Sequence, residues 1–390
     1  MTNDVQNIQS DDLHTVKGAM MGKKTGTIFF AVVCAVGVGF LVKFNKQTGI
    51  FRKLPEAAYL TESEAAERPA YQQLDDKEKA VYEALYRGIT NKQEFIMMPY
   101  EMNGDMYSKV YCILEKQEGK FFYLGSSYYT AEKIREAQVV YRDEIDLADS
   151  KMAELENAEN EALEAVNAKK SDYEKVMAIN DYIVNNCRYV TGDDKEYSPT
   201  SYGCLVKKEA NCEGYAKAFN MLAADAGLES MLITGITDKG ENHAWNQVKV
   251  DGSWYNIDVT WADTDDGDEV RRAYFLCDDN DFVQTHTADT KYIIPMECKD
   301  IKENYYIKND LYVDSLEKAE KIIADKIRSG QKMIEMKFAW DYLYVDFKKK
   351  YISDQYIFRI IAENGEELDG DLTVSIKEGD GDRCITLYVG

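Results

Sequence analysis

Between residues 210 and 230, apolar side chains recur at the spacing of an amphipathic helix. Tyr215, Phe219 and Leu222 share one face of that helix, since residues three and four apart lie on the same side. Gly227 follows where a glycine commonly ends a helix in the left-handed conformation. The pattern therefore predicts a helix that places Cys212 in its first turn.

The next two apolar stretches, residues 243–250 and 253–260, are rich in β-branched and aromatic residues. They are separated by Asp251-Gly252, a dipeptide favoured in two-residue type I′ turns, so together they predict a β-hairpin. With Val250 opposite Ser253, the register pairs Lys249 with Trp254, Gln247 with Asn256, Trp245 with Asp258, and His243 with Thr260.

This register places His243 and Asp258 on one face of the hairpin as diagonal neighbours. Diagonal neighbours lie roughly 7 Å apart between backbone positions, which is within side-chain reach. The sequence therefore predicts a hydrogen bond between the imidazole and the carboxylate.

Other segments carry weaker patterns. Residues 73–90 have helical spacing, and the Glu- and Ala-rich stretch 131–169 has high helix propensity. Beyond residue 300, short apolar runs predict strands at 305–307, 311–313, 333–338, 343–347, 356–361 and 384–389, and a helix at 316–327.

Residues 25–42 are 18 consecutive uncharged positions flanked by lysines on both sides. That length is at the lower edge of a transmembrane helix and too long for a typical signal-peptide core. Positive charges on the two sides do not decide the orientation. A short tail ahead of one span and a large body behind it resembles a signal anchor, so we expect a single-pass protein of the cell membrane with its body outside the cytoplasm.

These patterns divide the chain into six parts. We expect an N-terminal tail (1–24), a transmembrane helix (25–44), a linker (45–70), a mostly helical N-terminal domain (71–168), a catalytic domain (169–300) and a small α/β accessory domain (301–390). The accessory domain carries no catalytic signature.

Composition and motif spacing exclude several classes of function. A formal net charge of −23 argues against nucleic-acid binding, which requires clustered Lys and Arg. The eight cysteines form no C-x-x-C pair, so no zinc or thioredoxin-like site is indicated, and their disulfide pairing is left open. The acidic run 263–269 does not have EF-hand spacing, and no phosphate-binding loop is present. We therefore expect neither a metal nor a cofactor.

Cys212, His243 and Asp258 supply the parts of a nucleophilic site. A thiol needs a base to become a good nucleophile, and the base needs an acceptor that holds its ring in one tautomer. The unpaired N–H groups at the start of a helix favour the thiolate and could also hold a developing oxyanion. A thiol on a helix with a base and an acid on a hairpin is a layout for acyl transfer.

Four blocks of sequence resemble the bacterial branch of the transglutaminase-like superfamily. They are Ser201-Tyr202-Gly203-Cys204-Leu205-Val206-Lys207, Asn211-Cys212-Glu213-Gly214-Tyr215-Ala216, Asn242-His243-Ala244-Trp245-Asn246 and Trp254-Tyr255-Asn256-Ile257-Asp258-Val259-Thr260-Trp261, and the resemblance covers about residues 171–298. It implies a papain-like α+β core.

By this resemblance, Cys212 is the nucleophile, His243 the general base and acid, and Asp258 the carboxylate that orients His243. Tyr202 and Trp245 are candidates for oxyanion or substrate contacts. Cys204 departs from the family pattern, where a small residue is expected, and could be buried packing or a redox partner. Trp261 is interpreted as a core aromatic, and His286, which follows the acidic run 278–281, as structural or loop-exposed.

Three functions remain open. If water resolves the acyl-enzyme, the protein is a peptidase or deamidase that acts on proteins or peptides. If a lysine amine resolves it, the protein is a crosslinking transglutaminase. The third alternative is a non-catalytic binding or assembly module at the cell surface. We favour hydrolysis because nothing in the sequence marks an amine channel.

Overall fold

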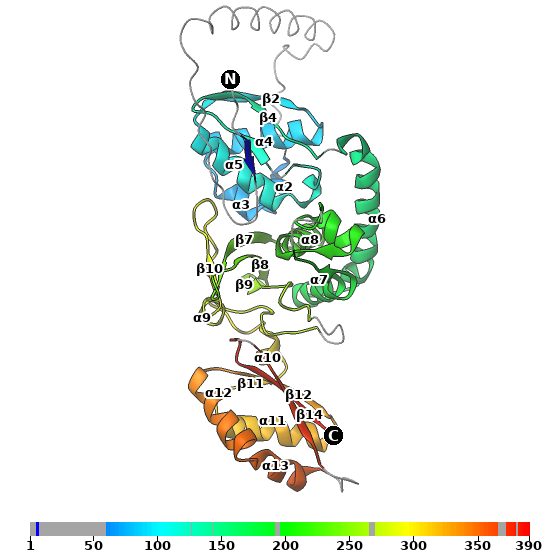
Figure 1. The fold of residues 1–390 in the computed structure, drawn as a ribbon, viewed down its shortest axis with the longest axis vertical. Coiled ribbons are helices and arrows are strands. Elements are labelled where there is room, and N and C mark those ends of the chain that lie inside the picture. The colour runs from blue at the N-terminus through cyan, green and yellow to red at the C-terminus, as the bar shows by residue number, and fades with distance from the viewer. Residues whose placement is uncertain are drawn as a thin grey trace, which may run out of the picture. The chain divides into compact units, whose positions relative to one another are not determined.

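The computed structural model describes residues 5–7, 60–125, 127–142, 144–191, 196–264, 270–365, 372–379 and 381–390. The chain separates into two compact units (Figure 1). One contains the described residues up to Ala66 together with 71–115 and 123–148, and the other contains 67–70, 116–122 and 149–390. The expected domain boundaries at 168/169 and 300/301 stay predictions.

The expected membrane helix, residues 25–44, lies outside the described residues, as do the linker up to residue 59 and residues 265–269 of the acidic run. Within the described part of the chain, every helix is too short or too polar to cross a bilayer.

The first unit combines helices with short strand pairs. Helix α4 (Asp76–Thr90) confirms the helical pattern there, and its first turn is closed by a capping box between Asp75 and Glu78. Helix α5 spans Gly104–Gln117. Strand β2 (Phe95–Met102) pairs antiparallel with β4 (Ile134–Gln138), and β3 (Ser127–Tyr129) pairs with β1 (Val5–Asn7). Two short helices precede α4, namely α2 (Glu62–Ala66) and α3 (Pro69–Gln72).

The high helix propensity of residues 131–169 does not give a helix over the whole stretch. Helix α6 begins at Ala148 and ends at Asn167, whereas Ile134–Gln138 forms β4. Ile134 and Ala137 are buried beside β2 while Arg135 and Glu136 are exposed. Tertiary pairing therefore overrides the helix propensity of this stretch.

The second unit holds the predicted hairpin within a four-stranded antiparallel sheet of order β10-β7-β8-β9. Its strands are β7 (Ser230–Thr237), β8 (Asn242–Val250), β9 (Ser253–Ile257) and β10 (His286–Ala288). The pairs Val250–Ser253, Lys249–Trp254 and Gln247–Asn256 confirm the predicted register. Asp251 and Gly252 have φ angles of 49° and 86°, as a type I′ turn requires.

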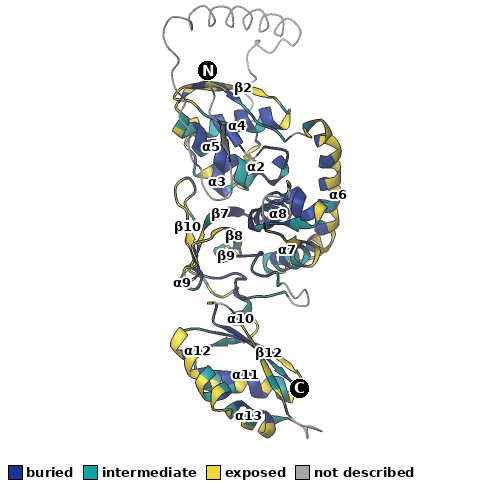
Figure 2. Cartoon of the chain, in the orientation of Figure 1, coloured by how far each residue is buried: buried dark blue, intermediate teal, exposed yellow. Residues whose placement is uncertain are grey.

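Helix α8 (Cys212–Asp225) packs against β7 and β8 and confirms the predicted helix. Asn211 caps it by accepting a hydrogen bond from the Gly214 N–H at 3.2 Å. Gly227 follows the end of the helix with a φ of +75°, a conformation that glycine adopts without steric cost. Figure 2 shows α8 buried over nearly its whole length, so this helix forms the centre of this part of the second unit rather than its surface.

Helix α7 (Asp172–Asn186) packs on α8. The chain between these two helices contains two short strands, β5 (Arg188–Tyr189) and β6 (Glu209–Ala210), which pair in parallel. It also contains a π-helical turn, η3 (Gly203–Lys207). A four-residue helix, α9 (Asp279–Phe282), precedes β10.

The C-terminal segment forms a second four-stranded sheet of order β11-β12-β14-β13. Its elements are β11 (Tyr312–Val313), α11 (Leu316–Arg328), β12 (Met333–Phe338), β13 (Val374–Glu378) and β14 (Cys384–Val389). The predicted helix at 316–327 and the predicted strands at 333–338 and 384–389 are confirmed. One apolar core joins this sheet and its helices to Met231, Ile233 and Trp245 of the first sheet.

Three predicted strands of this segment were wrong. Residues 305–307 lie in helix α10 (Tyr305–Lys308), 343–347 in α12 (Asp341–Phe347), which continues into the π-helical turn η4 (Lys348–Ser353), and 356–361 in α13 (Tyr356–Asn364). Ile357, Ile360 and Ile361 show the reason, because they are buried at the i, i+3, i+4 spacing of a helix face. A run of five or six apolar residues does not distinguish that spacing from a buried strand.

Candidate active site

The Cys212 thiol lies at the first residue of α8, against the sheet. Cys212, Ala216, Leu232 and Ala244 form one buried apolar cluster, and 7% of the cysteine surface is exposed. The Asn246 side chain reaches across from β8 and donates to the Ala216 carbonyl at 3.0 Å. This bond ties the first turns of α8 to the strand that carries His243, so the helix and the hairpin hold a defined spacing.

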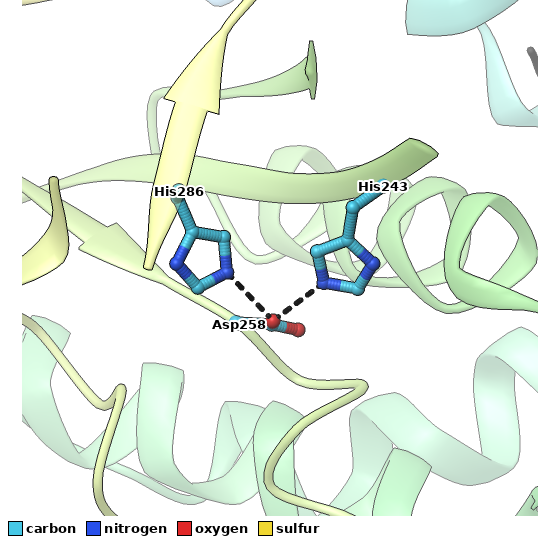
Figure 3. Close-up of side chains that lie close together, drawn as sticks. All are labelled: His243, Asp258 and His286. Atoms are coloured by element: carbon cyan, nitrogen blue, oxygen red, sulfur yellow. Dashed lines mark hydrogen bonds and ion pairs between the residues drawn. The ribbon is translucent and has the colours of Figure 1, made fainter. Parts of the chain in front are cut away.

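His243 and Asp258 are directly hydrogen-bonded, with 2.7 Å between His243 Nε2 and Asp258 Oδ2 (Figure 3). The other carboxylate oxygen, Oδ1, accepts the backbone N–H groups of Thr260 at 2.9 Å and Trp261 at 3.1 Å. Asp258 is thereby fixed by its own chain. Because Nε2 of His243 faces the carboxylate, Nδ1 is the ring nitrogen left to exchange a proton with the thiol.

The electrostatics favour a charged imidazole. Burial opposes the charge on His243, but the charge and hydrogen bond of Asp258, followed by the interaction with Cys212, raise its pKa to about 10. Burial would raise the pKa of Asp258, yet the interactions with His243 and then His286 hold it well below its usual value. The site therefore keeps an imidazolium beside a carboxylate, with the thiol as the third partner.

Glu213, next to the nucleophile, is a buried carboxylate that the sequence did not single out. It pairs with Lys116 Nζ at 2.7 Å and Lys217 Nζ at 2.8 Å, and all three side chains are nearly buried. Burial acts against its charge, but the two lysines prevail and lower its pKa to about 2. The i, i+4 spacing of Glu213 and Lys217 was the one signal available in the sequence, whereas Lys116 is far away in the chain.

Of the two alternatives for His286, structural or loop-exposed, the second was wrong. The structure buries its side chain fully and places Nε2 at 3.2 Å from Asp258 Oδ2. Its other ring nitrogen, Nδ1, lies 2.9 Å from Thr285 Oγ1. No local pattern could reveal this contact, since 28 residues separate His286 from Asp258.

The two residues expected to make oxyanion or substrate contacts are both buried. Tyr202 donates its hydroxyl to Glu154 at 2.5 Å and stacks on Phe122 with 4.7 Å between ring centroids. Tyr202 therefore contacts helix α6, through Glu154, rather than Cys212, His243 or Asp258. Trp245 packs its ring against His286 at 5.1 Å and against Phe282 at 5.6 Å, as a core aromatic does.

Like Cys212, the other six cysteines in the described residues are buried. All seven cysteines in the described part of the chain are free thiols. Burial, followed by the neighbouring Cys187, raises the pKa of Cys204. The second thiol near the site is therefore a buried neighbour of another thiol, and both are reduced in this structure.

His243, Asp258 and His286 also form the one group in the described residues whose ligand atoms could hold a metal ion, all within 4.8 Å of one another. The hydrogen bonds from both imidazoles to Asp258 account for this proximity. We assign no metal to it.

A thiol at the start of a buried helix, opposite a His–Asp pair on a sheet, defines the papain-like class of cysteine sites. The sequence model of the transglutaminase-like superfamily matches residues 160–259, a span that contains Cys212, His243 and Asp258. Over these residues the chain is similar to the transglutaminase-like superfamily.

Curated relatives match part of the chain. The kyphoscoliosis peptidases of Homo sapiens and Mus musculus are both 28% identical to it in an alignment of 169 residues, with coverages of 36% of this chain and 25% of theirs. The chain thus spans a quarter of the length of these relatives.

Solved structures align over a similar share. A TGase aligns with a TM-score of 0.26 and 17% identity, covering 30% of this chain and 33% of that protein. The periplasmic domain of TgpA from Pseudomonas aeruginosa aligns with a TM-score of 0.23 and 14% identity, covering 34% of this chain and 56% of that domain.

Proposed function

We propose that this protein is a cysteine enzyme that transfers acyl groups of proteins or peptides through a thioester on Cys212. The observation that carries the proposal is the buried 2.7 Å hydrogen bond between His243 and Asp258, opposite a cysteine at the start of α8. A base held in one orientation beside a thiol is what activates a cysteine nucleophile.

The reaction has two halves. The Cys212 thiolate attacks a glutamine side-chain amide or a peptide carbonyl, and backbone N–H groups at the start of α8 stabilise the oxyanion. His243 gives its Nδ1 proton to the leaving nitrogen, which departs as ammonia or an amine and leaves a thioester. His243 then takes a proton from water, the hydroxide attacks the thioester, and the acid is released as the Cys212–carbonyl bond breaks.

We favour hydrolysis over crosslinking. In a crosslinking reaction, a lysine amine would replace water in the second half, and the same three residues would serve it. The curated relatives that match this segment are named peptidases, which supports hydrolysis. The non-catalytic alternative is disfavoured because all three residues are kept and the His243–Asp258 bond is made.

We also propose that residues 25–44 anchor the protein in the cell membrane, with the body outside the cytoplasm. The uncharged stretch and its flanking lysines support the anchor. Protease added to intact cells should then remove the body. Digestion only after the cells are broken would overturn this orientation.

The test of the enzyme proposal is alkylation of the full-length protein by iodoacetamide from about pH 4 to about pH 9, with each cysteine followed by peptide mapping. Cys212 should react at acid pH where an ordinary thiol does not, and His243→Ala should remove that advantage. If Cys212 reacts like a free thiol, the proposal fails. Release of ammonia or new amino groups from a glutamine-rich protein, compared with incorporation of a labelled amine, then separates hydrolysis from crosslinking.

A further inference from the structure

One carboxylate oxygen in this site serves two histidines. Asp258 Oδ2 lies 2.7 Å from His243 Nε2 and 3.2 Å from His286 Nε2 (Figure 3). The two imidazoles approach it from different strands, β8 and β10. A three-residue site of thiol, base and acid needs only the first of these contacts, so the second calls for an explanation.

His286 is held in place from every side. Its ring stacks on Phe282 at 3.9 Å, and the rings of Trp261 and Tyr274 lie at 4.5 Å and 5.3 Å. Thr285 Oγ1 lies 2.9 Å from Nδ1. This cage leaves the imidazole one orientation, with Nε2 directed at Asp258.

The hydrogen-bond partners also define the tautomer of His286. Asp258 can only accept, so Nε2 carries a proton, and Nδ1 of the neutral ring is then an acceptor that lies 2.9 Å from the Thr285 hydroxyl oxygen. Burial, with the charge of His243 as a smaller cause, lowers the pKa of His286 although Asp258 acts in the opposite direction. The ionisable groups that face it are Asp258, His243 and Tyr274. His286 therefore donates as a neutral ring and leaves the single positive charge on His243.

A glycine on β7 allows β10 to lie close enough for His286 to reach Asp258. Ala288 of β10 pairs with Gly235 of β7, which on its other side pairs with His243. A Cβ atom at Gly235 would lie 2.1 Å from the Thr287 carbonyl oxygen and 2.7 Å from the Trp245 ring. The absence of a side chain at this position allows β10 to approach and brings His286 to Asp258.

We propose that His286 is a positioning residue for the nucleophilic site: its Nε2–H fixes Asp258 Oδ2 so that Asp258 orients His243 with Nδ1 toward Cys212. This inference rests on the proposed function. Strand β10 thereby contributes to the site, because it carries His286. With Oδ2 anchored by His286, Asp258 can hold the ring of His243 in a single orientation.

The experiment uses the full-length protein and the alkylation profile of Cys212 across pH. His286→Leu removes the donor and keeps an apolar side chain in the cage, whereas His286→Gln keeps an N–H that can reach Asp258. His286→Leu should lower the rate at acid pH by about tenfold, equivalent to about one pH unit in the profile. His286→Gln should stay within about twofold of the wild type, since it restores the donor.

The outcomes separate this inference from the proposed function. If wild-type Cys212 shows no acid-pH advantage, both fail. If the wild type shows it and a folded His286→Leu variant keeps the same profile, only the role of His286 is overturned. Should His286→Leu not fold, the ring ¹⁵N signals of the wild type decide, and the chain has only three histidines to assign. A protonated Nε2 with a bare Nδ1 on His286 supports the role, and the opposite tautomer or a charged ring overturns it.

Discussion

His243 Nε2 and Asp258 Oδ2 lie 2.7 Å apart, although the two residues are 15 positions apart in the chain, one on the first strand of the hairpin and the other just after its second strand. The Asp251-Gly252 turn sets the register that brings them together. The contact occupies one ring nitrogen and leaves the other for the thiol. The orientation of the base is therefore a consequence of strand pairing, not of a flexible loop.

Asp258→Asn should lower the rate of thioester formation by roughly 10³- to 10⁴-fold, because an amide can present N–H to His243 and favour the wrong tautomer. The measurement is kcat/KM on a glutamine-containing peptide or protein, with circular dichroism to check the fold. Glu297→Gln is the matched control, since Glu297 forms an exposed ion pair with Lys299. Equal activity of Asp258→Asn and the wild type would remove Asp258 from the mechanism.

The His243–Asp258 pair should make stability depend on pH on the alkaline side. The folded protein raises the pKa of His243 to about 10, so the protonated ring stabilises the fold below the unfolded value of about 6.5. This contribution should be lost as the pH rises from about 6.5 through about 10. The free energies of unfolding of His243→Gln and the wild type should differ most at and below about pH 6.5 and converge as the pH approaches about 10. A gap that widens toward pH 10 would contradict the assignment.

Glu213→Gln should destabilise the protein by about 3–5 kcal/mol, because it leaves Lys116 and Lys217 buried without their anion. Glu229→Gln is the control, because its ion pair with Lys249 is partly exposed and should be worth about 1 kcal/mol or less. Urea unfolding followed by fluorescence measures both. A loss at Glu213 no larger than that at Glu229 would mean that the buried ion pairs carry no net stability.

The same carboxylate predicts an acid limb of stability. Its pKa is lowered to about 2, so its contribution is present above the unfolded value of about 4.3. The contribution should be lost as the pH falls from about 4.3 through about 2. In that range the difference in unfolding free energy between wild type and Glu213→Gln should shrink.

Gly235→Ala should cost about 1–3 kcal/mol, because its Cβ would overlap the Thr287 carbonyl and force β10 away from β7. It should also slow Cys212 alkylation at acid pH, since His286 moves with β10. Ile236→Val, at an exposed neighbouring position, should change neither quantity measurably. A stable Gly235→Ala variant with wild-type reactivity would show that the close approach of β10 is not required.

Iodoacetamide at neutral pH should modify Cys212 well before Cys277. Burial raises the pKa of Cys277 to about 12, and the thiolate is the reacting species. Peptide mapping after a short exposure checks the order. Modification of Cys277 ahead of Cys212 would show that the protein opens before it reacts.

The elements that the sequence predicted correctly around the site are those whose signals are local. The apolar spacing from Tyr215 to Leu222 and the glycine at 227 predict α8 without reference to the rest of the chain. Asp251-Gly252 predicts the turn, and the turn sets the pairing of Val250 with Ser253. From these two elements the proximity of His243 and Asp258 follows, as the structure confirms.

The predictions were wrong for short segments whose conformation depends on contacts with distant parts of the chain. Residues 343–347 and 356–361 read as strands, yet both are helices that bury one face against the C-terminal sheet. Residues 134–138 read as helix, yet they pair with β2. In each case burial against a partner distant in the chain decided the conformation, and no window of a few residues contains that partner.

The sequence by itself determined the helix that carries Cys212 and the hairpin that brings His243 and Asp258 together, because helix ends, turn residues and strand register are encoded within a few neighbouring positions. Only the tertiary structure decided that His286 reaches Asp258 from β10, that Lys116 neutralises Glu213, and that Tyr202 turns to Glu154. These contacts join segments that are 28, 97 and 48 positions apart. A buried charge or hydrogen-bond donor needs a partner. Which residue becomes that partner depends on how the whole chain packs.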